Sequence, residues 1–316
     1  MSRPARQLAQ HLENLARPHY IFRPIQIVRR VVADLRPRSG EQRFQLQWGH
    51  AISADPHDPI GLALLRRGMF DLLVCETLLR LTDAGETVVD AGANIGQMTS
   101  LLAHAVGERG RVISFEPHPK VFARLARNAA QWQALPGSPQ LELHQVGLSD
   151  ADGVAKLSTD VFESNQGSAS LETPTQHRGR MDEHTVEVQR LDDALGDDVN
   201  VGVMKMDVEG HEIRALEGAS AMLRSGRIRD IVFEERDAPP TPVTRLLEDY
   251  GYTVIRLGEG LRGPLLGSIG AADVEGKDDP SLLATRAPER AIERLRVRGW
   301  AIYGVGPAGR IERRRR

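Results

Sequence analysis

The sequence contains very little cysteine, since Cys75 is the only cysteine among its 316 residues. A single cysteine cannot form an internal disulfide, and it excludes a four-thiolate zinc site and a cysteine-bound iron–sulfur cluster. Radical chemistry that depends on three cysteines is excluded for the same reason. We expect Cys75 to be a small buried side chain in a protein of a reducing compartment.

Long apolar runs are also missing. A helix that crosses a bilayer needs about 20 consecutive apolar residues, and the sequence has no run of that length. The N-terminus lacks the apolar stretch of a signal peptide. We therefore expect a soluble, cytoplasmic protein.

Lysine is scarce, and positive charge is concentrated as arginine at the two ends. Lys occurs only at positions 120, 156, 205 and 277. Residues 1–43 hold nine Arg and three acids, and residues 281–316 hold ten Arg and three Glu, although the whole chain has a net charge of −2. We expect no nucleic-acid partner, because the C-terminal arginine run has no aromatic residues for base stacking. A peripheral contact with an anionic membrane surface stays open.

Short apolar runs alternate with amphipathic stretches from residue 86 onward, which predicts an α/β fold with a doubly wound, mostly parallel, Rossmann-like sheet. The predicted core strands are residues 86–92, 111–117, 141–148, 201–210, 230–235 and 252–258, with 299–306 as a candidate seventh. Short strands at 154–159, 167–172 and 185–191 are predicted to form an insertion at the sheet edge. Residues 258–285 have no clear period and are expected to be a surface excursion.

A glycine-rich turn follows the first predicted strand. It contains Asp90, Gly92, Asn94 and Gly96, and a helical pattern begins directly after it. Glycines let the chain turn tightly and let a ligand approach the backbone, and a helix N-terminus offers unpaired N–H groups. Glu116 ends the second strand, where a carboxylate can accept hydrogen bonds from a ribose diol. The turn therefore predicts a nucleotide-type cofactor.

The spacing of that turn favours S-adenosylmethionine over a dinucleotide. A dinucleotide site has the pattern G-x-G-x-x-G, whereas Gly92 and Gly96 are separated by three residues. Asp90 suits a cofactor with a sulfonium and an ammonium group better than a pyrophosphate. An NAD-dependent oxidoreductase remains the alternative within the same architecture.

A second charged motif ends the fourth strand. Alternation along a strand places Lys205, Asp207 and Glu209 on one face, and His211 follows. Charged groups beside a sheet core must pair with one another, with a ligand or with a metal. Since ligands of open α/β sheets bind at the carboxyl ends of the strands, we interpret these four residues as catalytic candidates.

Together, these motifs resemble the FkbM family of S-adenosylmethionine-dependent methyltransferases. The resemblance covers about residues 85–257, through VVDAGANIG, FEPHP, VGLSDADG, KMDVEGHE and IVFEE. It implies a class I methyltransferase fold with seven strands, the last antiparallel, and O-methylation of a hydroxyl on a sugar, a glycolipid or a polyketide-type molecule. It also implies that Asp90, Gly92, Asn94 and Gly96 cradle the methionine part, that Glu116 holds the ribose and that Asp207 lies near the methyl group.

The hydroxyl that receives the methyl group must lose a proton. The sequence does not decide whether His211, Asp207 or Glu209 takes this proton. His211 as an ordinary first-turn helix residue is the alternative to a catalytic role. A second version of the site places a divalent cation among Asp207, Glu209 and either Glu234 or Glu235. A methyltransferase-like module that binds without catalysis is a further alternative.

We divide the chain into an N-terminal cap, residues 1–84, and a methyltransferase catalytic domain, residues 85–316. In the cap, residues 5–36 are predicted to form amphipathic helices, residues 44–53 an edge hairpin strand and residues 60–82 further helices. A small-molecule or glycan acceptor is the expected partner, and the sequence does not indicate an oligomeric state.

Overall fold

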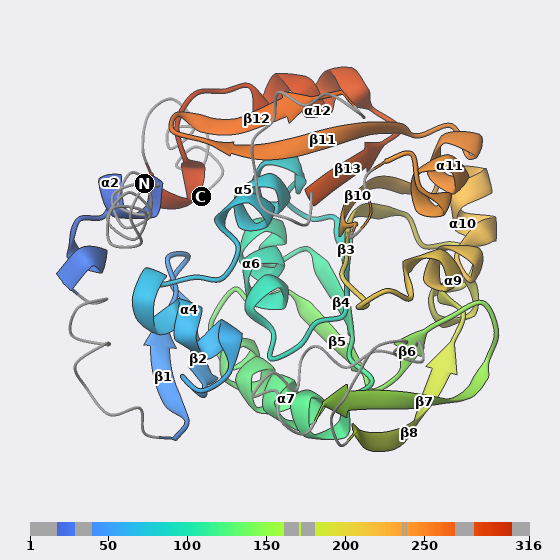
Figure 1. Ribbon diagram of the computed structural model, residues 1–316, viewed down its shortest axis with the longest axis horizontal. Coiled ribbons are helices and arrows are strands. Elements are labelled where there is room, and N and C mark those ends of the chain that lie inside the picture. The colour runs from blue at the N-terminus through green and yellow to red at the C-terminus, as the bar shows by residue number, and fades with distance from the viewer. Residues whose placement is uncertain are drawn as a thin grey trace, which may run out of the picture.

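The computed structural model describes residues 18–28, 40–160, 171, 181–235, 237, 239–268 and 281–304. Its centre is a twisted sheet with helices on both sides (Figure 1). Within the described residues this sheet has eight strands, in the order β12-β11-β13-β10-β9-β3-β4-β5. The strands are β3 (Thr87–Ala91), β4 (Arg111–Phe115), β5 (Gln140–His144), β9 (Val201–Met206), β10 (Ile228–Glu234), β11 (Thr253–Gly260), β12 (Gly263–Gly267) and β13 (Ser281–Thr285).

The strand order is that of a doubly wound sheet. From β3 the chain proceeds outward through β4 to β5, and it then returns to β9 on the other side of β3. Neighbouring strands from β5 to β10 are parallel, whereas β13 runs antiparallel between β10 and β11. The predicted α/β fold with a mostly parallel sheet is confirmed. The order reverses between β3 and β9, which is where such sheets bind ligands.

Each face of the sheet has its own hydrophobic core. Successive strand residues point to opposite faces, so that Val88 joins one core and Val89 the other. The first core is covered by α5 (Leu72–Leu81), α6 (Gln97–Val106), α7 (Pro119–Gln133) and α12 (Pro288–Leu295). The second is covered by α8 (Leu191–Leu195), α9 (Glu212–Glu217), α10 (Ser220–Ser225) and α11 (Pro242–Asp249).

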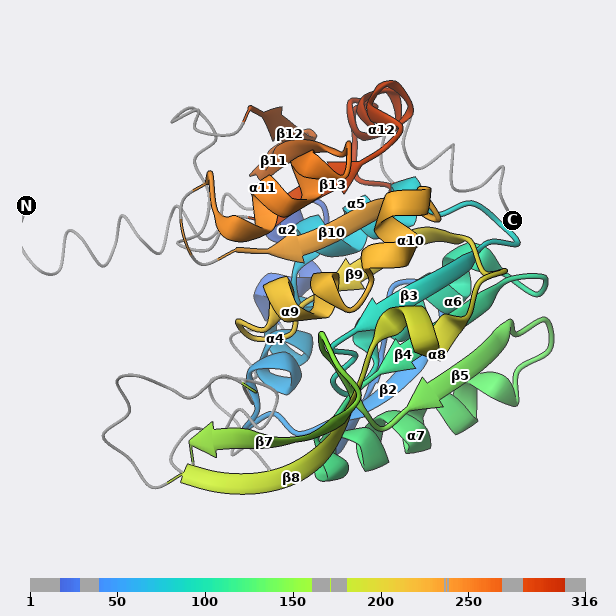
Figure 2. The same ribbon diagram turned by 90° about the vertical axis from the view of Figure 1, so that its right-hand side faces the viewer.

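Two smaller sheets flank the main one. A three-stranded sheet, of order β6-β8-β7, contains β6 (Gly147–Leu148), β7 (Gly153–Asp160) and β8 (Met181–Gln189). It confirms the inserted strands predicted at 154–159 and 185–191, whereas the strand predicted at 167–172 falls on residues of which only 171 is described. Figure 2 shows the β7–β8 hairpin extending on the side toward which the arrowheads of β3, β9 and β10 point.

The N-terminal region packs on the first core. The hairpin of β1 (Gln42–Gln45) and β2 (Ala51–Ala54) is tied to α7, because the Trp132 indole donates to the Ala51 carbonyl at 2.6 Å. The predicted helices of residues 60–82 are α4 (Pro59–Arg67) and α5. Of residues 5–36, only 18–28 are described; they include α2 (Pro18–Ile21), and the rest of that prediction lies outside the described residues. Since α5 shares a core with the main sheet, the division at residue 84 stays a prediction.

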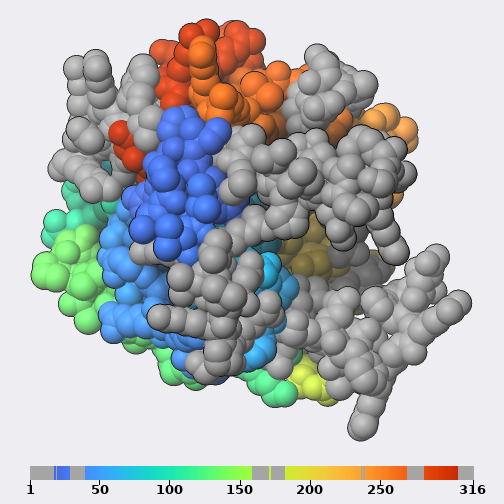
Figure 3. Space-filling view, turned by 60° about the vertical axis from the view of Figure 1, so that its left-hand side comes forward, coloured from blue at the N-terminus to red at the C-terminus, as the bar shows by residue number. Residues whose placement is uncertain are grey.

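The first and the last described segments of the chain lie side by side. Figure 3 shows the blue residues 18–28 against the red C-terminal part of the chain. The Arg23 guanidinium lies 5.8 Å from the centre of the Tyr303 ring, in a cation–π arrangement. None of the described helices is long and apolar enough to cross a membrane.

Two predictions for the C-terminal part were wrong. Of residues 299–306, the described part, 299–304, does not form the seventh strand, since the short helix η1 spans Ala301–Tyr303. That strand is β13, which lies in the stretch 258–285 predicted to be a surface excursion, and β12 adds an eighth strand to the seven implied. The sequence of β13, SLLAT, is short and buried along its whole length, so it has no alternation to detect.

A buried ion pair fastens the C-terminal segment to α5. The Glu76 carboxylate accepts the backbone N–H groups of Ala301 and Ile302 at 2.6 and 3.0 Å, and Arg80 Nε lies 2.7 Å from it. The Arg80 guanidinium donates to four backbone carbonyls between residues 294 and 299. Both side chains are therefore hydrogen-bonded where water is excluded.

We predict that Arg80→Met lowers the free energy of unfolding by about 3–5 kcal/mol, because the Glu76 charge would stay buried without its cation. Arg111→Met is the matched control: it breaks the partly exposed Arg111–Glu142 pair and should cost at most about 1 kcal/mol. Urea unfolding of the two variants measures both losses. Equal, small losses would contradict the role of the buried pair.

Candidate functional site

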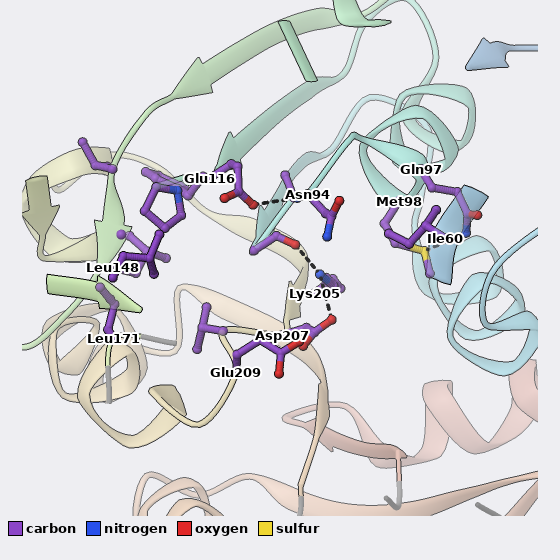
Figure 4. Close-up of a pocket in the computed structure, with 18 of the residues that line it drawn as sticks. Ile60, Asn94, Gln97, Met98, Glu116, Leu148, Leu171, Lys205, Asp207 and Glu209 are labelled. Carbon is purple, nitrogen blue, oxygen red and sulfur yellow. Dashed lines mark hydrogen bonds and ion pairs between the residues drawn. The ribbon is translucent and has the colours of Figure 1, made fainter. Parts of the chain in front are cut away.

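A pocket opens at the carboxyl ends of β3, β4 and β9. Figure 4 shows its polar centre, with Asn94, Lys205 and Asp207 between two apolar ends. One end includes Leu148, Leu157 and Leu171, which the sequence analysis did not single out, and the other includes Ile60, Phe70 and Met98. The pocket therefore lies at the reversal of strand order that the fold predicts as a ligand site.

The turn after β3 brings the backbone close to the pocket. Gly92 has a φ of +74°, and a Cβ there would collide with the Asp207 carbonyl oxygen. Only glycine fits, because this turn and the turn after β9 touch through their backbones. Asn94 also has a positive φ, +51°, and its side-chain oxygen accepts the Ile95 N–H at 2.8 Å. Gly92 and Asn94 both line the pocket.

Glu116 is a buried carboxylate at the end of β4. One oxygen accepts the Asn94 N–H and the other accepts the His118 N–H, both at 2.9 Å. Burial, opposed by these two hydrogen bonds, raises the pKa of Glu116 to about 7. The side chain lines the pocket, so a hydroxyl of a bound ligand can use the remaining lone pairs of the carboxylate.

The structure places Asp90 and Gly96 behind the pocket rather than on its wall. Asp90 is fully buried, and its Oδ2 accepts the Thr99 hydroxyl at 2.6 Å. Gly96 precedes α6 with a φ of +95°, and a Cβ there would lie 2.7 Å from a methyl carbon of Leu125 and 2.8 Å from Trp132. Gly96 is thus needed for the packing of α6 against α7.

Lys205 is the buried cation at the centre of the site. Its Nζ donates to the Gly92 carbonyl at 2.7 Å and lies 3.6 Å from both Asp90 Oδ1 and Asp207 Oδ2. Burial alone would lower the pKa of Lys205, but the surrounding carboxylates, Asp207 and Asp90 first, leave it raised. Lys205 is therefore a permanent positive charge that holds the two turns together.

Asp207 and Glu209 carry negative charge along the wall next to Lys205. The Asp207 N–H donates to the Ala91 carbonyl at 3.1 Å, and the Asp207 side chain is 37% exposed, so its carboxylate is anchored yet accessible. Glu209 has a φ of +55° and also lines the pocket. Lys205, Asp207 and Glu209 come together on this wall, but strand alternation is not the reason, because β9 ends at Met206 and Val208 lines the pocket as well.

The fourth member of that motif lies elsewhere. Among the described residues, His211 is not part of the pocket wall; it is 5% exposed, and its Nε2 lies 3.0 Å from the Ser149 hydroxyl. Both Glu209 and Gly210 have a positive φ, so the chain reverses between Asp207 and His211. A continued strand alternation does not hold across such a turn.

The apolar end near α4 was missed by the sequence analysis. Gln97 fixes this end, because its amide donates to the Phe70 carbonyl and accepts the Phe70 N–H, each at 2.8 Å. Phe70 lies 27 residues before Gln97, so the contact depends on the packing of α5 against α6. No local pattern in the sequence reports it.

The sequence analysis left open a divalent cation among Asp207, Glu209 and either Glu234 or Glu235. Among the described residues, no three His, Cys, Asp or Glu side chains are arranged to hold a metal ion. Glu235, one of the proposed ligands, accepts the Thr241 hydroxyl at 2.7 Å.

Comparison with known proteins gives a consistent set of similarities. The sequence matches the model of the methyltransferase FkbM domain over residues 90–254. It is 29% identical over 199 residues to the methyltransferase sdnD of Sordaria araneosa, a match that covers 54% of this chain and 74% of that protein. It is 28% identical over 177 residues to the hexuronic acid methyltransferase AglP of Haloferax volcanii, covering 56% of this chain and 67% of that protein.

Among solved structures, the chain is similar to the methyltransferase FkbM from Methylobacillus flagellatus. The two are 16% identical with a TM-score of 0.44, and the match covers 64% of this chain and 44% of that one.

We predict that Lys205→Met lowers the free energy of unfolding by about 3–5 kcal/mol, since Asp90 would keep a buried charge without a cation. The double variant Lys205→Met/Asp90→Asn should recover most of this loss, because the amide is neutral and still accepts the Thr99 hydroxyl. Urea unfolding of the three proteins measures the recovery. An equal loss in the single and double variants would contradict the ion pair as the cause.

Proposed function

The chain belongs to the methyltransferase FkbM family, and from this premise we propose that it methylates a hydroxyl oxygen of a sugar, a glycolipid or a polyketide-type small molecule. Its methyl donor is S-adenosylmethionine. The family match overturns the alternative of an NAD-dependent oxidoreductase.

The pocket residues fit a ligand that carries positive charge. The carboxylates of Asp207 and Asp90 lie 3.6 Å from Lys205 Nζ, and Glu116 and Glu209 line the same pocket, so carboxylates outnumber the lysine among these described residues. The turn at Gly92 leaves no room for a side chain, so a ligand would meet bare backbone there. When bound, S-adenosylmethionine supplies an electrophilic methyl group on a cationic sulfur. Glu116 would accept the ribose hydroxyls, and the backbone of Gly92 and Asn94 would hold the methionine part.

Asp90 and Gly96 would act indirectly in this site. Asp90 would keep Lys205 in place beneath the Gly92 turn, since the two side chains form a buried ion pair. Gly96 would set the position of α6, whose N-terminal residues Gln97 and Met98 line the pocket. Both residues would therefore shape the cofactor site without touching the cofactor.

A pair of carboxylates, Asp207 and Glu209, lies on the wall beside Lys205, and this pair is the observation that supports a hydroxyl acceptor. A hydroxyl is a poor nucleophile until its proton is removed, and a carboxylate can take that proton. Asp207 would be the base, because its side chain is accessible, whereas Lys205 stays protonated. An acceptor that reacts through its own carboxylate needs no base and would face like charges.

One relative supports a carbohydrate acceptor by its name, hexuronic acid methyltransferase. The two carboxylates suit a polyhydroxylated molecule in a second way, since each can accept hydrogen bonds from neighbouring hydroxyls. The hydroxyls of a sugar or polyol would thus be both bound and deprotonated on this wall.

The proposal is tested with methyl-labelled S-adenosylmethionine and acceptors of matched size that carry hydroxyls only, a carboxylate or a phosphate. We expect label in products that resist mild alkali, as methyl ethers do. Methylation found only in alkali-labile esters would contradict the proposal. A protein that binds S-adenosylhomocysteine but labels no acceptor would support the non-catalytic alternative.

We predict that Asp207→Asn lowers kcat by about 10²–10⁴-fold, because an amide cannot take the hydroxyl proton. Affinity for S-adenosylhomocysteine, measured by calorimetry, should change little. Glu209→Gln on the same wall is the control and should mainly raise the KM of the acceptor. A near-normal kcat in Asp207→Asn would show that another group accepts the proton.

We predict that S-adenosylhomocysteine binds more weakly as the pH falls below about 7, where Glu116 becomes protonated. The raised pKa means that Glu116 is a carboxylate only above this pH, and the ribose hydroxyls need it as an acceptor. Well below the pKa, each pH unit should cost up to about tenfold in affinity. Calorimetry of the wild type and of Glu116→Gln between acid and alkaline pH measures this. The variant should bind weakly with a flat profile, and a pH-dependence that persists in the variant would contradict the assignment.

A further inference from the structure

A chain of hydrogen bonds lies directly behind the pocket and uses residues of two motifs. Its first member, His211 Nε2, lies 3.0 Å from the Ser149 hydroxyl. The Ser149 hydroxyl donates to Asp150 Oδ1 at 3.0 Å, and Arg214 donates to Asp150 Oδ2 at 3.0 Å. Since the Ser149 proton is directed at Asp150, the serine oxygen is the acceptor and His211 Nε2–H is the donor.

The inner half of this chain is protected from water. Ser149 is 6% exposed and His211 is 5% exposed, whereas Asp150 and Arg214 reach the surface. The Ser149 hydroxyl, ahead of Arg214, holds the pKa of Asp150 below its usual value, which agrees with a hydrogen bond donated to a carboxylate. A buried hydrogen bond with a fixed direction specifies a single arrangement of the groups that it joins.

The hydrogen-bond chain joins two segments that line different parts of the pocket. Residues 146–148, directly before Ser149, line its leucine-rich end, and residues 207–209, directly before the turn to His211, form its carboxylate wall. Each segment is also tied to a strand: the Ser149 N–H donates to the Gln189 carbonyl of β8, and the Asp207 N–H donates to the Ala91 carbonyl of β3. The hydrogen bond from His211 to Ser149 links these two attachments.

The close approach of α9 depends on a further feature. A Cβ on Gly218, directly after α9, would collide with the Ser149 carbonyl oxygen. The helix that begins after His211 is thus packed against the Ser149 turn at both of its ends. His211 therefore cannot turn toward the pocket without breaking its hydrogen bond to Ser149.

We propose that His211 and Ser149 are positioning residues that fix the distance between the leucine-rich end and the Asp207–Glu209 wall. The inference rests on the proposed function, because it assigns the adenine of the cofactor to the end with Leu148 and the acceptor to the wall with Asp207. His211 then acts through Ser149 and takes no proton from the acceptor. Loss of this link lets the leucine-rich end and the Asp207–Glu209 wall move apart. Cofactor binding then weakens, and Asp207 is displaced from the acceptor at the same time.

The test compares His211→Ala, Ser149→Ala, the double variant and His211→Gln, whose amide nitrogen can replace Nε2 as a donor. Each alanine variant should raise the Kd of S-adenosylhomocysteine about tenfold, as expected for one broken buried hydrogen bond. The double variant should be no worse than either single variant, since both remove the same link. His211→Gln should restore binding, and the pH profile of kcat/KM should keep its shape.

Ser138→Ala is the control, because the Ser138 hydroxyl also donates hydrogen bonds, in this case to backbone carbonyls, but lies after α7, away from the pocket. Its Kd should equal that of the wild type. If a buried variant fails to fold, Arg214→Ala at the exposed end of the chain should still weaken binding, by a smaller factor. Circular dichroism identifies the folded variants.

Two results would overturn the inference. Unchanged Kd values in the alanine variants, with a normal wild type, would mean that the link does not position the pocket. A loss of kcat of about 10²-fold or more in His211→Gln, with unchanged Kd and one limb of the pH profile missing, would make His211 the base instead. A wild type that does not bind S-adenosylhomocysteine would instead overturn the proposed function, so the two failures are distinguishable.

Discussion

The buried ammonium of Lys205 is the interaction on which the site depends. Two turns, one after β3 and one after β9, would otherwise meet as backbone carbonyls and carboxylates with no positive charge between them. Lys205 donates to Gly92 and faces both Asp90 and Asp207, so a single cation compensates groups from both turns. An unpaired charge at this depth would cost several kcal/mol, which explains why the ion pair, the glycine turn and the accessible Asp207 occur together.

The position of this cation determines what the pocket can bind. Lys205 is already ion-paired with carboxylates and hydrogen-bonded to a carbonyl of the protein itself. The wall that faces a ligand is therefore negative rather than positive. This character suits a cationic methyl donor and an acceptor that must be deprotonated. The family to which the chain belongs accounts for the methyl donor, and the charge of the wall supports the proposed hydroxyl acceptor.

The sequence predicted the centre of the site well because its signals are local. Gly92, Asn94 and Glu116 follow strand ends, and Lys205, Asp207 and Glu209 lie at or just after the end of β9, so each could be placed without knowing the rest of the fold. The sequence failed where position depends on distant contacts. β13 is a short buried strand that pairs with strands distant in the sequence. Leu157 reaches the pocket from β7 of the inserted sheet, and Leu171 lies between β7 and β8 in the sequence. His211 is turned away by the positive φ angles before it. Gly96 looked like a cofactor residue, yet its lack of a side chain is required by Leu125 and Trp132.

The measurement that tests the account most directly is a crystal structure of the protein with S-adenosylhomocysteine and a hydroxylated acceptor. The account predicts the ribose on Glu116, the adenine beside Leu148 and the acceptor oxygen within hydrogen-bond reach of Asp207, about 3 Å from its carboxylate. A cofactor bound in the opposite direction, with its adenine beside Ile60 and Phe70, would contradict the account. So would an acceptor oxygen in contact with Lys205 and remote from Asp207.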